Sequence, residues 1–173
     1  AALRAGEIDW PWADPAGGPP VIVGRYPCLM GAMAVRPGEL CAVHVVAVDP
    51  SGMRLARPLD PGGSPISPRL TIGAAVGAAV RFGAAGPGLV IATQIELGAR
   101  IAAGTPGRPV WAAIRLGNLG RVDPGPVQDV TLAVYRTRKS AAGERRIEEA
   151  AAMHAARGPF VRIARIRPPR EGA

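Results

Sequence analysis

Glycine and proline punctuate this chain so densely that its apolar segments are almost all short. The 173 residues include 23 glycines and 19 prolines, and the clearest apolar runs between them are Leu40–Val48, Leu89–Leu97 and Val110–Leu116. Short apolar runs with turn residues on both sides are typical of β-strands, and several of them at close spacing indicate a sandwich or a small barrel. We therefore predict a mainly β fold, a small antiparallel six-stranded β-barrel.

Weaker patterns supply the other expected strands. Residues 21–35 predict two short strands broken near Pro27 or Gly31, and residues 53–59 alternate apolar and basic side chains. Residues 70–82 are rich in alanine, but their glycines disfavour a helix, so we expect a turn and then a strand. Residues 160–167 alternate apolar side chains with arginine, which predicts an edge strand.

The pattern changes to a helical one after residue 118. Asp123 is a suitable N-cap and Pro124 a suitable first helical residue. Three valines then recur at helical spacing and predict a helix over residues 124–139: Val127, Val130 and Val134. A second helix is predicted from Glu144 to Arg157. The predicted barrel is thus followed by C-terminal helices.

These elements predict three parts of the chain. Residues 1–20 form an extended, proline-rich lead, in which Trp10 and Trp12 are expected to pack on the chain's own core. Residues 21–139 form the barrel domain with its closing helix. Residues 140–173 form a helical and basic extension.

The charge of the chain favours an anionic partner. It carries 21 basic and 13 acidic side chains, a net charge of +8, and Lys139 is its one lysine. Arginine binds phosphate in a planar, two-pronged geometry and stacks on bases, so nucleotides, nucleic acids and membrane surfaces are candidate partners. Aromatic residues make up only 4% of the chain. Because proteins that bind nucleic acid strands commonly stack bases on aromatic rings, no DNA partner is expected.

No pattern in the sequence predicts catalysis. The two histidines, His44 and His154, are too few and too separated for a metal site; we expect His44 to be a satisfied residue inside a strand and His154 to lie on the surface. Cys41 and His44 point to opposite faces of a predicted strand, which excludes a simple nucleophile–base pair. The chain has no Walker A motif. We therefore expect a protein that is not an enzyme and holds no cofactor.

The expected location is the cytoplasm. No apolar run reaches the roughly 18 residues of a membrane-spanning helix, and the first residues lack the apolar region of a signal peptide. Cys28 and Cys41 are spaced unlike a redox or zinc motif, so two reduced thiols are expected.

Several segments occur in the order found in one family. They are Gly24-Arg25-Tyr26, the turn Asp49-Pro50-Ser51-Gly52, Leu70–Gly73 with Ala79–Phe82, and Trp111–Leu119 before the predicted helix. In this order the stretch from Gly24 to Lys139 resembles a PilZ domain, the bacterial receptor of the second messenger cyclic di-GMP. The resemblance implies a cytoplasmic, nucleotide-binding regulatory domain of bacterial signalling, built on a small barrel.

The resemblance also implies a ligand site. In PilZ domains an RxxxR motif grips the phosphates and stacks on guanine, and a D/N-x-S-x-x-G turn reads a guanine edge, which places the candidate site at Arg25, Asp49, Ser51 and Arg54. Two positions depart from the motifs: Val21 stands where the first arginine belongs, and Arg54 stands where the final glycine belongs. We expect these departures to weaken the binding of cyclic di-GMP.

The hypothesis is therefore a non-enzymatic, PilZ-like regulatory domain that is degenerate in ligand binding. One alternative is an adaptor that no longer needs a ligand and docks onto a protein partner. Another is a small flavin-binding or catalytic barrel.

Overall fold

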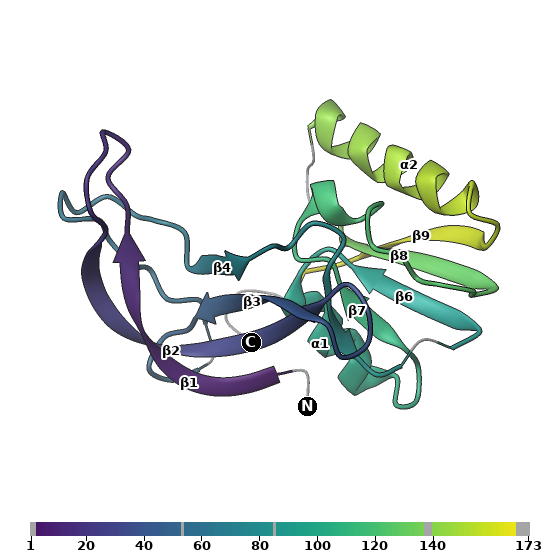
Figure 1. The fold of residues 1–173 in the computed structure, drawn as a ribbon, viewed down its shortest axis with the longest axis horizontal. Helices are drawn as coiled ribbons and strands as arrows, with labels where there is room; N and C mark the ends of the chain where they lie inside the picture. The colour runs from purple at the N-terminus through teal and green to yellow at the C-terminus, as the bar shows by residue number, and fades with distance from the viewer. Residues whose placement is uncertain (1–2, 53, 85, 137–139, 169–173) are drawn as a thin grey trace. The chain divides into compact units, whose positions relative to one another are not determined.

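The computed structural model describes residues 3–52, 54–84, 86–136 and 140–168 (Figure 1). These residues form a mixed sheet of nine strands with two α-helices, in the order β4-β3-β2-β5-β7-β6-β8-β9, and β1 pairs with β2. The sheet does not close, so the predicted antiparallel six-stranded barrel is wrong. The chain divides into two compact units: unit 1 is Leu3–Gly31 with Val43–Gly73, and unit 2 is Ala32–Ala42 with Ala74–Ala173.

Unit 1 is built from antiparallel strands. The four that contribute to it are β1 (Leu3–Trp12), β2 (Val21–Ala34), β3 (Leu40–Ala47) and β4 (Arg69–Gly73). Strand β1 lies where an extended lead was expected, and it pairs with β2 from Leu3↔Gly31 to Trp12↔Val21. Trp10 is buried and meets Tyr26 edge to face, with ring centroids 6.3 Å apart. The prediction that Trp10 packs on the chain's own core is confirmed.

Unit 2 is built mainly on parallel strands. Strand β7 is antiparallel to β5, whereas β6 is parallel to both β7 and β8, and β8 is parallel to β9. The strands are β5 (Ala79–Phe82), β6 (Gly88–Ala92), β7 (Val110–Ala112), β8 (Asp129–Tyr135) and β9 (Phe160–Ile166). Strand β9 forms one end of the sheet, as predicted for an edge strand. Two of its arginines are ion-paired, Arg162 with Asp129 and Arg165 with Glu144.

Two helices make the crossovers that parallel strands require. Helix α1 (Ile95–Gly104) connects β6 to β7, and α2 (Ala141–Ala155) connects β8 to β9. Helix α2 confirms the second predicted helix, whereas α1 replaces the second half of the strand expected at Leu89–Leu97. No helix in the described part of the chain is long and apolar enough to cross a membrane.

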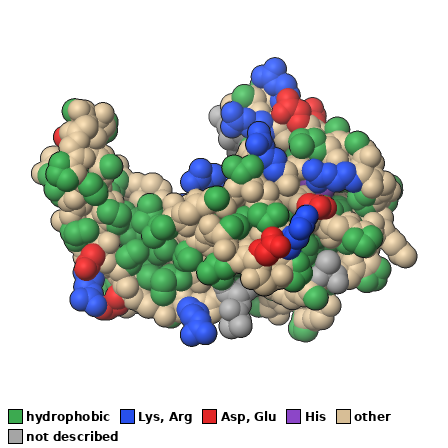
Figure 2. Space-filling model, in the orientation of Figure 1, with side chains coloured by type: hydrophobic (Ala, Val, Ile, Leu, Met, Phe, Trp, Pro, Cys, Tyr) green, Lys and Arg blue, Asp and Glu red, His purple; other side chains and the backbone are tan. Residues whose placement is uncertain are grey.

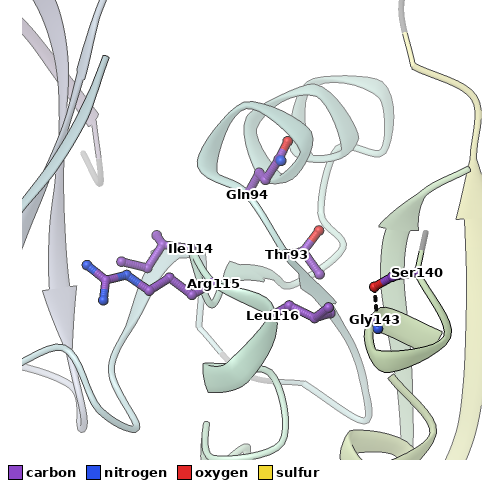
Figure 3. Close-up of a pocket in the computed structure, with 7 residues that line it drawn as sticks. All are labelled: Thr93, Gln94, Ile114, Arg115, Leu116, Ser140 and Gly143. Carbon is purple, nitrogen blue, oxygen red and sulfur yellow. Dashed lines mark hydrogen bonds between the residues drawn. The ribbon is translucent and has the colours of Figure 1, made fainter. Parts of the chain in front are cut away.

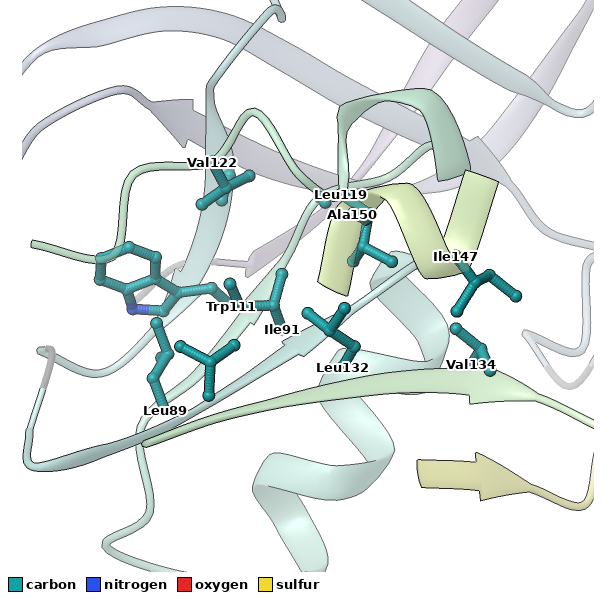
Figure 4. Close-up of a cluster of buried hydrophobic side chains, with 12 residues drawn as sticks. Leu89, Ile91, Trp111, Leu119, Val122, Leu132, Val134, Ile147 and Ala150 are labelled. Atoms are coloured by element: carbon teal, nitrogen blue, oxygen red, sulfur yellow. The ribbon is translucent and has the colours of Figure 1, made fainter. Parts of the chain in front are cut away.

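The two helices cover opposite faces of the parallel strands. On one face, alternate residues such as Leu89, Ile91 and Leu132 pack with Ile147 and Ala150 of α2 (Figure 4). On the other face, the residues between them pack with α1; they include Val90, Ala92, Val110 and Ala133, which gather around Leu97. Strands buried on both faces are apolar at successive positions, which explains the unbroken apolar runs in the sequence.

The helix predicted for residues 124–139 is also wrong where the structure describes it; residues 137–139 lie outside the described residues. Asp123 does not cap a helix, because its Oδ1 accepts a hydrogen bond from the Gly125 amide (2.9 Å) and closes a turn. The chain then enters β8, in which Val130, Leu132 and Val134 alternate toward the α2 face. The valines at positions 130 and 134 fit a strand period of two as well as a helical period.

Gly98 lets α1 approach the sheet closely. A Cβ at this position would lie 2.9 Å from Cε2 of Phe82 and 3.1 Å from Cβ of Ala112. We expect Gly98→Ala to lower the free energy of unfolding of unit 2 by about 1–2 kcal/mol, because overpacking outweighs a gain in helix propensity of roughly 1 kcal/mol. Chemical denaturation measures this. In the matched variant Gly104→Ala the new methyl group meets open space, so equal losses in both variants would contradict the packing explanation.

Candidate functional site

A pocket opens at the carboxyl edge of the parallel strands in unit 2. Strands β6, β7 and β8 run in the same direction, so the segments that leave their carboxyl ends lie at the same edge. From β6 the chain crosses through α1 to one side, and from β8 it crosses through α2 to the other, which makes this edge the point where the strand order reverses. Ligands of open α/β sheets bind at such reversal points. The pocket has a volume of about 290 Å³, and its lining includes Thr93, Gln94, Ile114, Arg115, Leu116, Ser140 and Gly143 (Figure 3).

Both helices of unit 2 begin at this pocket. Gln94 is the N-cap residue of α1 and Ser140 is that of α2. The Ser140 hydroxyl accepts a hydrogen bond from the Gly143 amide (3.2 Å), whereas the Gln94 side chain caps no amide of α1. The first amides of a helix and the positive end of its dipole attract anions. The pocket therefore lies between two helix termini of the same polarity.

Arg115 gives the pocket a mobile positive charge. It follows β7, is exposed, and forms no ion pair with any carboxylate of the described residues. In Figure 3 its guanidinium extends past Ile114 and away from Ser140. Exposed side chains change rotamer within nanoseconds, so the guanidinium can turn toward a ligand. Thr93, in contrast to Arg115, is buried, with only 8% of its surface exposed.

The loop that carries Arg115 has a strained backbone held by a buried amide. Ile114 has φ of 59°, the left-handed region that β-branched residues rarely adopt. Asn118 holds this loop: its Nδ2 donates to the carbonyls of Ala113 (3.0 Å) and Ala78 (2.9 Å), and its Oδ1 accepts from the Gly77 amide (2.7 Å). Backbone strain of this kind costs about 1–3 kcal/mol and is concentrated at binding and catalytic sites.

The positive charge of the protein is concentrated in unit 2. The charges of unit 1 balance among the described residues: Arg4, Arg25, Arg54, Arg57 and Arg69 against Glu7, Asp9, Asp14, Asp49 and Asp60. In the described part of unit 2, thirteen arginines (36, 81, 100, 108, 115, 121, 136, 145, 146, 157, 162, 165 and 167) stand against seven carboxylates (39, 96, 123, 129, 144, 148 and 149). Figure 2 shows basic side chains gathered over α2. An excess of positive charge around a pocket raises the local concentration of anions.

The residues that the PilZ resemblance singles out lie in unit 1. Asp49, Ser51 and Arg54 come together in one turn, where Asp49 Oδ1 accepts hydrogen bonds from the Ser51 hydroxyl (2.7 Å) and the Arg54 amide (3.4 Å). Arg25 is exposed on β2, and its Nε lies 3.1 Å from Oε2 of Glu7 on β1. The structure thus brings three of the four residues into one turn and pairs the fourth with a neighbouring strand.

The structure confirms the prediction for one histidine and contradicts the prediction for the other. His44 is buried in β3 with Nδ1 2.9 Å from the Thr71 hydroxyl, which confirms the expected satisfied histidine. His154 was expected on the surface, but it is fully buried, so that prediction is wrong. Within the described residues, no group of three His, Cys, Asp or Glu side chains is placed to hold a metal ion.

Comparison of the chain with known protein families, with curated proteins and with solved structures finds no match. Membership of the PilZ family therefore stays a prediction.

Sequence reasoning missed the pocket because it missed α1. The signal was nevertheless in the sequence: the apolar run Leu89–Ala92, the amphipathic segment Ile95–Gly104 and the apolar run Val110–Ala112 form a strand–helix–strand pattern. That pattern is typical of a parallel sheet, and it would have placed residues 93–94 and 113–116 at one edge.

Proposed function

We propose that the protein is a binding domain that takes the phosphate group of a nucleotide-type ligand into the pocket of unit 2. The observation that carries this proposal is the convergence of two helix N-termini on one pocket at the reversal point of a parallel sheet. Backbone amides at helix termini bind phosphate without any metal ion or charged side chain.

The size and composition of the pocket support a small polar group rather than an apolar one. A volume of about 290 Å³ lies at the lower end of the range for ligand pockets. This volume suits a phosphate and its sugar, with the base outside or at the rim. The hydroxyls of Thr93 and Ser140 and the amide of Gln94 offer the hydrogen-bonding groups such a ligand uses.

The charge distribution supports the same ligand class. Long-range attraction of an anion toward unit 2 follows from its excess of arginines, and Arg115 can add a charged hydrogen bond at the pocket itself. Unit 1 has no such excess. Cyclic di-GMP, the ligand that the sequence resemblance implies, belongs to this class and is a suitable first ligand to test.

Arg115→Ala tests this placement of the ligand. We expect the affinity for cyclic di-GMP or GTP, measured by titration calorimetry at low salt, to fall roughly 10- to 150-fold, since a charged hydrogen bond contributes about 1.5–3 kcal/mol.

The matched control is Arg25→Ala, an exposed arginine of unit 1 that the resemblance places at the ligand. We expect it to leave the affinity unchanged. The reverse result, with loss in Arg25→Ala alone, would move the ligand to the turn of residues 49–54. Absence of binding by the unmodified protein to both nucleotides would overturn the proposed function.

A further inference from the structure

A buried histidine fastens α2 to the loop that follows β7. The Nε2 atom of His154 lies 2.9 Å from the carbonyl oxygen of Leu119, which can only accept, so Nε2 carries the proton and donates. The other ring nitrogen, Nδ1, then accepts from Nη1 of Arg157 (3.4 Å). Nη1 of Arg157 also donates to the carbonyl of Val122 (3.0 Å). Hydrogen bonds to the carbonyls of Leu119 and Val122 thus hold the end of α2 against this loop.

The helix and the loop are in close contact at Gly120, where there is no room for a side chain. A Cβ added to Gly120 would lie 2.9 Å from Cα of Ala150 and 2.9 Å from Sδ of Met153. Leu119 of the loop belongs to the same buried cluster as Ile147 and Ala150 of α2. Because protein interiors are close-packed, a change at this contact moves the helix or the loop as a whole.

The same two segments form walls of the pocket. The loop begins with Arg115 and Leu116, at the start of the 3-10 turn Leu116–Asn118, and the N-terminal end of α2 contributes its N-cap residue Ser140 and Gly143. His154 holds them together from the far end of α2. The distance between α2 and the loop therefore depends on the protonation state of His154, which is not among the residues that line the pocket.

Protonation of His154 is incompatible with these contacts. A proton on Nδ1 would point at the guanidinium of Arg157, which puts donor against donor and cation against cation. The other charged group acting on the ring is the exposed Asp123. Burial is the largest cause of a lowered pKa of His154, and Arg157 lowers the pKa further; the hydrogen bond to Leu119 and the charge of Asp123 act in the opposite direction.

The sign of the effect follows from this lowered pKa. We call the state with the His154 hydrogen bonds intact fastened, and the state in which α2 has separated from the loop released. Above the ordinary histidine pKa of about 6.5, the ring is neutral in both states, and the contact has its full strength. As the pH falls below that value, the released ring takes up a proton that the fastened ring does not. The fastened state loses stability until the pH reaches the lowered pKa.

We propose that the protonation state of His154 regulates the pocket: the neutral ring holds α2 and the loop in the binding arrangement, and acid releases them and lowers the affinity for the phosphate ligand. This inference rests on the proposed function for its ligand. A direct electrostatic effect has the opposite sign, because a new positive charge attracts an anion. It is small, because roughly 20 Å of helix separates Ser140 from His154 and a Coulomb interaction weakens with distance.

Hydrogen exchange of the free protein at pH 7.5 and 5.5 tests the release without any ligand. After correction for intrinsic exchange rates, we expect opening of residues 116–122 and 141–150 to become more frequent at pH 5.5, by up to about tenfold. In His154→Gln, an amide replaces both the donor and the acceptor and does not titrate, so opening should be independent of pH. An equal pH dependence in both proteins would overturn the proposal.

Calorimetry with cyclic di-GMP, whose phosphodiesters keep their charge over this range, tests the link to the pocket. We expect the affinity of the unmodified protein to fall by up to about tenfold from pH 7.5 to 5.5, and that of His154→Gln to stay constant. Gly120→Ala should weaken the same contact at pH 7.5, where His154 is neutral, and so lower the affinity there as well. More frequent opening at pH 5.5 without a change in affinity would overturn the proposal that His154 regulates the pocket. Absence of binding at both pH values would overturn the proposed function, and hydrogen exchange alone would then decide the role of His154.

Discussion

Asn118→Ala is expected to lower the free energy of unfolding of unit 2 by about 3–5 kcal/mol. The buried amide of Asn118 makes three hydrogen bonds, to Gly77, Ala78 and Ala113, which belong to two separate segments of unit 2. The substitution removes the partner of the part-buried Gly77 amide and one donor from each of two carbonyls, of which Ala113 keeps the Arg115 amide (2.8 Å). Each group left unsatisfied costs about 1–3 kcal/mol, and the truncated buried side chain adds a cavity. Urea denaturation followed by fluorescence reports this loss, since Trp111 is the one tryptophan of unit 2.

The control for Asn118 is a second amide side chain in the same unit. Gln128 is exposed, and Gln128→Ala should change the free energy of unfolding by less than about 0.5 kcal/mol. A loss below 1 kcal/mol in Asn118→Ala would show that the loop before η1 (Leu116–Asn118) is held by other contacts. The structural role given to Asn118 would then be wrong.

Leu132→Ala is the second change for which we expect a large loss, about 2–5 kcal/mol. Leu132 is fully buried in β8 and packs with Ile147 and Ala150 under α2 (Figure 4). Its truncation removes apolar contact and leaves a cavity that the surrounding strands cannot fill. The free energy of unfolding of unit 2 from denaturant melts measures the effect.

Leu40 provides the matched control for Leu132. It is also assigned to unit 2, but 65% of its surface is exposed. We expect Leu40→Ala to be nearly neutral, because little apolar area returns to water. Comparable losses in the two variants would contradict the placement of β8 at the centre of the core.

The sequence was sufficient to predict strands, but not their direction. The apolar runs beginning at Leu40, Leu89 and Val110 are all strands in the structure. Whether two strands are parallel depends on the segment between them, and here that segment is α1, whose glycines lower its helix propensity. Gly98 is present because the sheet lies within contact of the helix. This requirement is tertiary, so no local pattern in the sequence reveals it.

The candidate pocket could not be predicted from the sequence for a related reason. Its lining comes from three separate segments, around Gln94, Arg115 and Ser140, none of which has a motif of its own. They meet because three parallel strands end at one edge. The residues of the turn at Asp49 were easier to find, since they are close in sequence. The structure shows that the Asp49 carboxylate already binds groups of its own turn.

The edge strand β9 has a consequence for the behaviour of the protein at high concentration. An uncovered strand edge is a template on which another chain can extend the sheet and begin to aggregate. Arg162 and Arg165 lie on opposite faces of this strand, and each is paired with a carboxylate of its own unit. A second strand that added to this edge would have to accommodate these charged pairs or break them. The protection of this edge is therefore electrostatic, and dissolved salt weakens it.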